Sequence, residues 1–145
     1  MKFLIIGLGN FGRTLAEELT DRGHEVIGID TNEQRVDVLK DRIAVAYIMD
    51  ATEHNALRAL PLAEIYCAVV AIGHSMDNSL RTVAALKEQS VPTIYARALD
   101  NTHQQILNAM NIASIFIPES LAATMLAAKW TAPTPEPQAP TAPAK

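Results

Sequence analysis

KFLIIGLGNFGRTLAEELTDRGHEVIGID, the stretch from Lys2 to Asp30, decides the fold of this chain. It opens with an apolar run over residues 2–6, passes directly into a glycine-rich turn, and continues as an amphipathic segment over residues 13–22. A second apolar run over residues 25–29 ends at Asp30. This order predicts a strand, a tight turn, a helix, a second strand and a terminal carboxylate, which is the opening unit of a doubly wound α/β sheet.

The glycine-rich turn reads GLGNFG over residues 7–12, which is the spacing of a dinucleotide-binding fingerprint. In that fingerprint Gly7 makes the tight turn, Gly9 lets a pyrophosphate approach the backbone, and Gly12 lets the helix pack on the strand. The free N–H groups in the first turn of the helix then face the phosphates. The alternative is a tight turn whose phosphate site is vestigial.

Asp30 lies eighteen residues after Gly12, close to the separation at which a carboxylate accepts hydrogen bonds from a ribose diol. A 2′-phosphate would meet this carboxylate as like charge against like charge, so NADP is disfavoured. We therefore expect NAD(H) or a simple adenine nucleotide as the ligand.

The composition indicates a globular chain. Its 145 residues are 49% hydrophobic and 19% charged, with a net charge of −4. No apolar run approaches the ~20 residues that cross a bilayer. An acidic chain lacks the clustered positive charge that binds nucleic acid. Because a strand is predicted from residue 2, we expect no signal peptide and a cytoplasmic location. The four histidines are not at metal-ligand spacing, so we expect surface or capping roles for them and no metal site.

Strand and helix patterns alternate as far as residue 130. Further strands are predicted over residues 43–48, 66–72, 93–96 and 114–117; helices are predicted over 33–41 and 76–89, after Asp100 or Asn101, and briefly between Thr52 and Pro61. Six alternating strands imply a parallel, Rossmann-type sheet with strand order 3-2-1-4-5-6. The ligand crevice then lies between the first and fourth strands, where the 7–12 turn faces a turn over residues 73–75.

The segment over residues 119–130 is strongly helical by propensity and apolar nearly all the way round. A helix on the surface of a lone domain should show a polar face, so we expect this one to pack into a second subunit of a symmetric dimer. The alternative is that it lies along the edge of the sheet. Residues 1–130 would then form one domain, and residues 131–145, with five of the eight prolines, a disordered tail rich in proline and alanine.

A predicted domain over residues 1–130 leaves no room for the second domain that a nicotinamide dehydrogenase needs. A module that binds a nucleotide without catalysis is therefore the leading hypothesis. Its rivals are a small NAD-dependent oxidoreductase, or the cofactor-binding module of one, and a structural adaptor that binds nothing.

Taken together, six short motifs resemble the nucleotide-binding N-terminal domain of RCK/KTN (TrkA-N) proteins over residues 1–129. They are GLGNFG at 7–12, GHEV at 23–26, ID at 29–30, DAT at 50–52, VAIG at 70–73 and IPE at 117–119. The resemblance implies a cytosolic regulatory subunit of a Trk or Ktr potassium uptake system, or the gating domain of a potassium channel. It also implies binding of NAD(H) or ATP/ADP, a membrane-embedded transporter subunit as partner, and a homodimer that can assemble into an octameric ring.

The resemblance also assigns roles to particular residues. The phosphates would be lined by Gly7, Gly9, Asn10, Phe11 and Gly12. The adenosine ribose would be held by Asp30 with the adjacent Thr31, and the adenine would be bordered by Asp50, Ala51 and Thr52. Gly73 would close the crevice on the opposite side.

Two further charged residues have alternative interpretations. Arg97 would reach the phosphates, or is an ordinary surface arginine. Glu119 would help to hold a cation near the phosphates, or complements the dipole of its helix.

Two features depart from the family pattern. Asn10 stands where some ATP-preferring relatives carry arginine, which weakens the case for a triphosphate. The C-terminal ligand-binding domain usual in these subunits has no counterpart in the sequence, so we expect no second-messenger site here.

Overall fold

The computed structural model describes residues 1–134, so residues 135–145 of the predicted tail lie outside the described part of the chain. Six parallel strands form one sheet in the order β3-β2-β1-β4-β5-β6, which confirms the predicted topology. The strands are β1 (Lys2–Ile6), β2 (Glu25–Asp30), β3 (Val45–Ile48), β4 (Cys67–Val70), β5 (Ile94–Arg97) and β6 (Ser114–Phe116).

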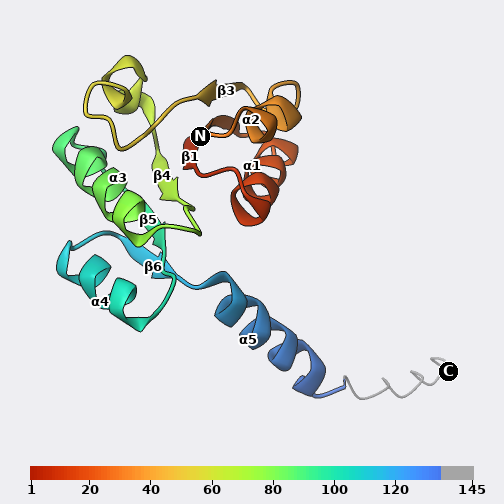
Figure 1. The fold of residues 1–145 in the computed structure, drawn as a ribbon. Helices are drawn as coiled ribbons and strands as arrows, with labels where there is room; N and C mark the ends of the chain where they lie inside the picture. The colour runs from red at the N-terminus through yellow and green to blue at the C-terminus, as the bar shows by residue number, and fades with distance from the viewer. Residues whose placement is uncertain (135–145) are drawn as a thin grey trace, which may run out of the picture.

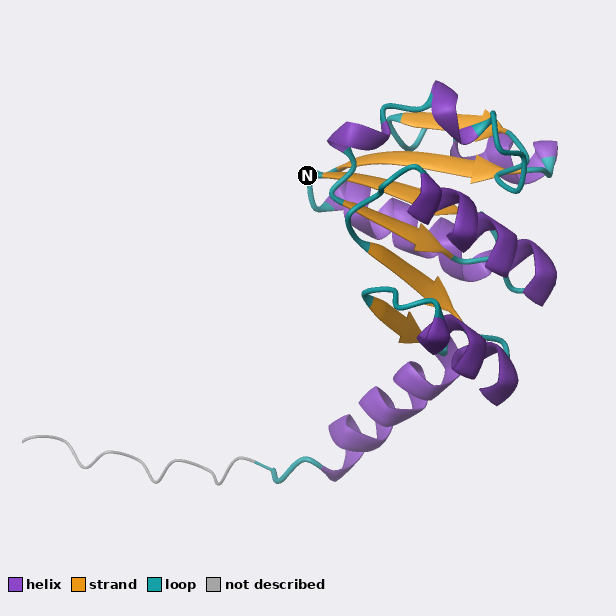
Figure 2. Ribbon diagram, turned by 90° about the vertical axis from the view of Figure 1, so that its left-hand side faces the viewer, coloured by secondary structure: helices purple, strands orange, loops and turns teal. Residues whose placement is uncertain are grey.

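Helices cover both faces of this sheet (Figures 1 and 2). They are α1 (Asn10–Asp21), α2 (Glu33–Leu39), α3 (Met76–Glu88), α4 (Asn101–Ala109) and α5 (Pro118–Thr131), with two short 3₁₀ helices at Leu57–Ala59 and Leu62–Glu64. Alternate residues of the strands point to opposite faces, so two separate cores form. Phe3 and Ile5 of β1 pack with α1 and α2, whereas Leu4 and Ile6 belong to the core that contains residues of α3 and α4.

Side-chain caps fix where three of the helices begin. Asn32, Ser75 and Asp100 accept hydrogen bonds from backbone N–H groups three residues later, at 3.2, 3.1 and 2.8 Å. Each bond satisfies a donor that the first turn of a helix leaves without an intrahelical partner. Of the two alternatives that the sequence left open for α4, Asp100 rather than Asn101 is the cap.

Several predicted boundaries were wrong. Helix α1 begins at Asn10 rather than residue 13, because the turn ends at Gly9 and the second half of the glycine motif is already helical. The short helix expected before Pro61 is instead a single 3₁₀ turn at Leu57–Ala59, and a second 3₁₀ turn follows the proline at Leu62–Glu64. Proline disfavours helical geometry in the residue before it, and Leu60 is accordingly extended with ψ 153°. The fifth strand runs on to Arg97, one residue past its predicted end.

His103 was expected at the surface or in a capping role, but its side chain is fully buried under α4. Its Nδ1 accepts a hydrogen bond from the N–H of Leu99 at 3.0 Å, so the ring fixes the segment that enters the helix. Burial lowers the pKa of His103, and the nearby Asp100 carboxylate opposes this effect. The ring is therefore neutral at physiological pH.

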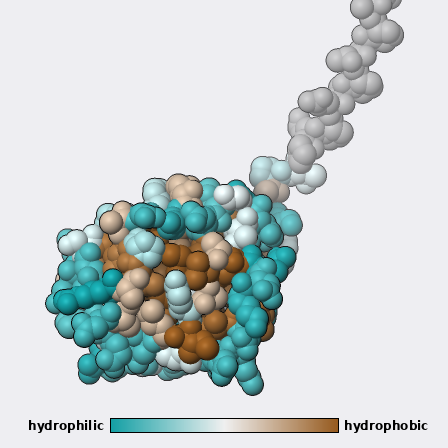
Figure 3. Space-filling model, turned by 90° about the horizontal axis from the view of Figure 1, so that it is seen from above, coloured by the Kyte–Doolittle hydropathy of each residue, from teal (hydrophilic) through white to brown (hydrophobic). Residues whose placement is uncertain are grey.

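Strand β3 forms one edge of the sheet and is only partly covered. Val45, Tyr47 and Ile48 are exposed, as is Val38 of α2. Figure 3 looks onto this end of the molecule and shows apolar side chains gathered in the middle of the face within a hydrophilic rim. Within residues 1–134, no helix has the length and apolar character that a bilayer span requires.

The first helix is seated on the first strand by two glycines. A Cβ on Gly12 would lie 1.8 Å from the carbonyl oxygen of Gly7, so the helix backbone touches the turn directly. Gly7 has φ +95°, a conformation that side chains rarely adopt, and its N–H donates to the Ile29 carbonyl at 2.8 Å. These contacts hold the N-terminus of α1 above the ends of β1 and β2.

Replacing Gly12 tests this packing. We expect Gly12→Ala to lower the free energy of unfolding by about 3 kcal/mol or more, because its methyl group would overlap a backbone carbonyl. Gly9→Ala is the matched control, since a Cβ on Gly9 meets nothing within 4 Å. It should cost less than about 1 kcal/mol, the usual effect of alanine at an N-cap. Urea denaturation of both variants measures the difference, and equal costs would contradict the packing argument.

Candidate functional site

Two turns meet at the carboxyl ends of β1 and β4, the point where the strand order reverses. A Cβ on Gly7 would lie 3.0 Å from both the Ala71 carbonyl carbon and the Ile72 nitrogen, so the turns are in close contact. Two hollows open here and share Gly7, Asp30, Ile72 and His74. In open α/β sheets, ligands bind at this switch point.

Asp30 lies at the end of β2 between the two hollows and is only 8% exposed. Its Oδ2 accepts a hydrogen bond from the N–H of Leu8 at 2.7 Å, and its Oδ1 accepts one from the N–H of Asn32 at 2.8 Å. Arg35 lies 3.5 Å from Oδ2. A carboxylate has about four lone-pair positions, so Asp30 braces the glycine turn and keeps acceptor capacity toward the crevice.

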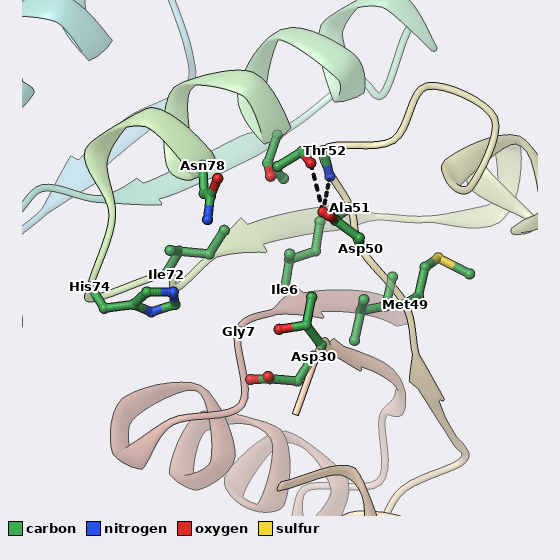
Figure 4. Close-up of a pocket in the computed structure, with 13 residues that line it drawn as sticks. Ile6, Gly7, Asp30, Met49, Asp50, Ala51, Thr52, Ile72, His74 and Asn78 are labelled. Atoms are coloured by element: carbon green, nitrogen blue, oxygen red, sulfur yellow. Dashed lines mark hydrogen bonds between the residues drawn. The ribbon is translucent and has the colours of Figure 1, made fainter. Parts of the chain in front are cut away.

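The first hollow has the chemistry of a site for a flat, polar ring. Asp50, Ala51 and Thr52 line one side of it, and His74 and Asn78 line the other (Figure 4). Asp50 Oδ1 accepts from the backbone N–H of Thr52 at 2.9 Å and from its hydroxyl at 2.6 Å, which holds this loop in place. Ile6, Ile29, Met49 and Ile72 supply apolar surface.

One further lining residue is Thr82 of α3, which sequence reasoning missed. Its hydroxyl is buried and has no hydrogen-bond partner among the described residues. An unpaired buried hydroxyl costs stability unless a ligand or water pairs with it. No motif marked it: Thr82 lies four residues after Asn78 on the same helix face, but Asn78 was not a predicted site residue either.

The second hollow has the chemistry of an anion site. It runs past Gly7 and Gly9 to Arg97, with Phe11 and Gly73 on its wall. Gly9 caps α1 without a side chain, and no acidic residue stands in the first turn of that helix. The free N–H groups and the positive end of the α1 dipole therefore face the hollow with no acidic residue of the helix's own first turn beside them. Asp30 also lines this hollow, where its Oδ2 accepts from the Leu8 N–H.

Arg97 is not an ordinary surface arginine. Its side chain is only 22% exposed, and a Cβ on Gly73 would lie 3.0 Å from its Nη1, so the guanidinium rests against the crevice turn. Its Nη2 donates to Glu119 Oε1 at 3.1 Å. Glu119 itself lines neither hollow and reaches the site only through Arg97.

Most of the predicted site residues line one or both hollows; they are Gly7, Gly9, Phe11, Asp30, Thr31, Asp50, Ala51, Thr52, Gly73 and Arg97. Gly12 lies beneath the turn, where it packs the helix. Asn10 lines a neighbouring hollow with Arg13 and Arg35 instead. Among the described residues, no group of three or more His, Cys, Asp or Glu side chains is arranged to hold a metal ion.

Comparison with known proteins identifies the family. The family model of the TrkA-N domain matches residues 3–118. The chain belongs to the TrkA-N domain family. Ktr system potassium uptake protein A of Bacillus subtilis is 36% identical over 81% of this chain and 53% of its own length. Trk system potassium uptake protein TrkA of Mycobacterium tuberculosis is 30% identical over 74% of this chain and 49% of its own length.

This TrkA-N chain thus spans about half the length of these curated relatives. They are named for potassium uptake, which favours the non-catalytic hypothesis over the oxidoreductase hypothesis.

Solved structures confirm the predicted Rossmann-type fold. The TrkA-N domain of the inner membrane protein ybaL from Escherichia coli superposes with a TM-score of 0.76 at 22% identity, covering 87% of this chain and 94% of that one. The Kef C-terminal domain of Shewanella denitrificans in its AMP-bound form gives 0.72 at 22% identity over 92% and 84%. GsuK bound to ADP gives 0.74 at 16% identity over 90% and 34%.

Removing the charge of Asp30 tests its bracing role. In Asp30→Asn the amide NH₂ would face one of the two backbone N–H groups that now donate hydrogen bonds to the carboxylate, so that hydrogen bond would be lost. We expect the free energy of unfolding to fall by about 1.5–3 kcal/mol, the value of hydrogen bonds to a charged group. The control Asp50→Asn alters an exposed loop and should cost less than about 0.5 kcal/mol. Equal midpoints for the two variants in urea denaturation would show that Asp30 does not brace the turn.

Proposed function

We propose that this TrkA-N domain binds an adenine nucleotide, NAD(H) or ATP/ADP, and regulates a potassium uptake system or channel in response. The observation that carries this proposal is the open Gly9 backbone at the N-terminus of α1. It leaves room for a phosphate beside the free N–H groups of the first turn of α1, with the Asp30 carboxylate nearby for a ribose.

The residues of the crevice fit the parts of such a ligand in order. The backbone of residues 7–12 would hold the phosphates, with Arg97 as their cation and Gly73 opposite. Asp30 and Thr31 would hold the ribose, and residues 50–52 would border the adenine. The unpaired hydroxyl of Thr82 fits a ligand that brings polar ring atoms into the first hollow. The Kef domain in its AMP-bound form and GsuK bound to ADP support this choice of ligand class.

The link to potassium comes from the relatives named for potassium uptake. We accordingly propose a membrane potassium-transporter subunit as partner, and a place for this domain in the cytoplasm at the inner face of the membrane. The family resemblance also implies that Glu119 helps to hold a cation near the phosphates; in this chain Glu119 lines neither hollow, and the cation it contacts is the Arg97 guanidinium. The domain itself supplies no reaction: its residues bind, orient and report the nucleotide.

Nucleotide binding predicts a rise in the melting temperature. A ligand at one hundred times its Kd adds about 2.7 kcal/mol of stability. We expect millimolar NAD, NADH, ATP or ADP to raise the melting temperature of the wild-type chain, and Gly9→Asp to abolish the rise by placing a carboxylate in the phosphate path. Aspartate is a favoured N-cap, so this variant should fold. Gly9→Ala controls for the loss of glycine. If no nucleotide shifts the wild-type chain, the chain is a structural adaptor and the sensor proposal fails.

Dimerisation is the second part of the proposal. No residue of α5 is buried, and Figures 1 and 2 show the helix extending away from the sheet. Its apolar side chains are exposed, Met125 at 70% and Trp130 at 75%. A helix apolar on all sides requires cover, because water contact with so much apolar surface is unfavourable.

The sheet offers the matching surface. A groove of about 810 Å³ lies over β1, β4, β5 and β6 on the α1 face, lined by Phe3, Phe11, Leu15, Val69, Tyr95 and Phe116 among others. Parallel sheets are normally covered on both faces, and here half of one face is open. The α5 helix of a second copy fits this groove in apolar character, and two such contacts related by a two-fold axis would close a dimer. Such dimers would be the units of the octameric ring that the family resemblance implies.

Charged substitutions on α5 test the dimer. Met125→Glu combined with Leu126→Glu should weaken self-association by roughly 100-fold or more, because each carboxylate would be buried without a partner. The control Val38→Glu changes an exposed apolar residue of α2 that does not line the groove, and it should leave the dimer intact. Sedimentation equilibrium of the 15.7 kDa chain reports the mass. A wild-type monomer at high micromolar concentration would contradict the arrangement.

A further inference from the structure

Arg97 stands between the anion site and the last helix. One end of its guanidinium, Nη1, lies against the position where a Gly73 side chain would begin, and the other, Nη2, donates to Glu119 Oε1 at 3.1 Å. Arg97 also lines the hollow that contains Gly7 and Gly9. The same cation therefore faces the phosphate site and pairs with a carboxylate of α5.

The Arg97–Glu119 pair connects the end of β5 to the first turn of α5. Within residues 1–134, it is the one side-chain hydrogen bond or ion pair that joins α5 to the rest of the domain. Helix α5 buries no residue of its own, and Glu119 is its second residue, with a side chain 72% exposed. The seating of the first turn of α5 thus depends on a carboxylate that water can reach and that a stronger anion can replace.

We propose that Arg97 exchanges Glu119 for the distal phosphate of a nucleoside diphosphate, so that occupation of the crevice releases the first turn of α5. The inference rests on the proposed nucleotide binding and adds to it a route from the ligand to the dimerisation helix. Arginine binds phosphate through two parallel hydrogen bonds, and a phosphate carries more charge than a carboxylate. An ion pair whose carboxylate is exposed to water contributes little net stability, so the exchange is favourable.

The geometry also makes Arg97 sensitive to the number of phosphates. With its ribose at Asp30, a nucleotide places its first phosphate over the glycine turn that follows β1. The Arg97 guanidinium lies against the turn after β4, which is the next strand after β1 in the sheet. This turn is two strand spacings, about 10 Å, from the end of β2 that carries Asp30. A second phosphate reaches it, whether free in a nucleoside diphosphate or as part of a dinucleotide pyrophosphate. A monophosphate ends short of it and leaves the Arg97–Glu119 pair in place.

Glu119→Gln tests the exchange by removing the competing charge while keeping the side-chain shape. ADP should bind this variant roughly 2- to 5-fold more tightly than the wild-type chain, the range that an exposed ion pair provides, and AMP should bind both equally. In the wild-type chain, ADP should speed hydrogen exchange in the first turn of α5 and change the emission of Trp130, the only tryptophan, whereas AMP should do neither. Without nucleotide, Glu119→Gln should already show the faster exchange.

Glu18→Gln is the matched control. It removes a comparable exposed ion pair, that with Arg22 at 3.4 Å near the far end of α1, and should behave as the wild-type chain in every measurement. Equal ADP affinities for the wild-type chain and Glu119→Gln, or equal responses of α5 to ADP and AMP, would overturn the exchange while nucleotide binding stands. A failure of all variants to bind ADP or AMP in calorimetry would overturn the proposed function itself, and the exchange with it.

Discussion

The direct contact between the Gly12 backbone and the Gly7 carbonyl is the constraint on which the site depends. A helix this close to a strand end presents its first free N–H groups at the switch point of the sheet, beside the turn after β4. The same arrangement brings the N–H of Leu8 within 2.7 Å of Asp30, so the ribose-facing carboxylate and the phosphate-facing backbone are fixed relative to each other. Packing and ligand recognition here share the same atoms.

The crevice and the dimer groove are adjacent because α1 borders both. Phe11, in the first turn of that helix, lines each of them, and its ring packs on Phe116 of β6 with 5.0 Å between centroids. Arg97 lies on β5 and reaches Glu119 just beyond β6. The strands that carry the ligand end of the site therefore also carry the surface on which α5 would dock, which gives a short mechanical route between nucleotide and assembly.

Much of this architecture was predictable from the sequence, for identifiable reasons. The glycine turn, the alternation of strands and helices, and Asp30 at the end of β2 are set by local pattern, and their spacing fixes the strand order. Residues that meet only through the fold were harder to find. Asn78 and Thr82 enter the first hollow from α3 and His74 from the turn before it, and no motif marks these three side chains. Arg97 was recognised by its position along the chain, but its pairing with Glu119 depends on how β6 leaves the sheet.

The uncovered edge at β3 has a consequence for how the domain behaves outside its complex. Its four residues, Val45 to Ile48, carry no charge, and an unpaired strand edge offers backbone donors and acceptors to any other extended chain. Natural sheets usually protect such an edge with lysine, proline or a bulge. Here the shortness of the four-residue strand is the only such protection within residues 45–48, so this edge is open to pairing with a second copy at high concentration. A charged residue at Tyr47 would be the simplest remedy for preparative work.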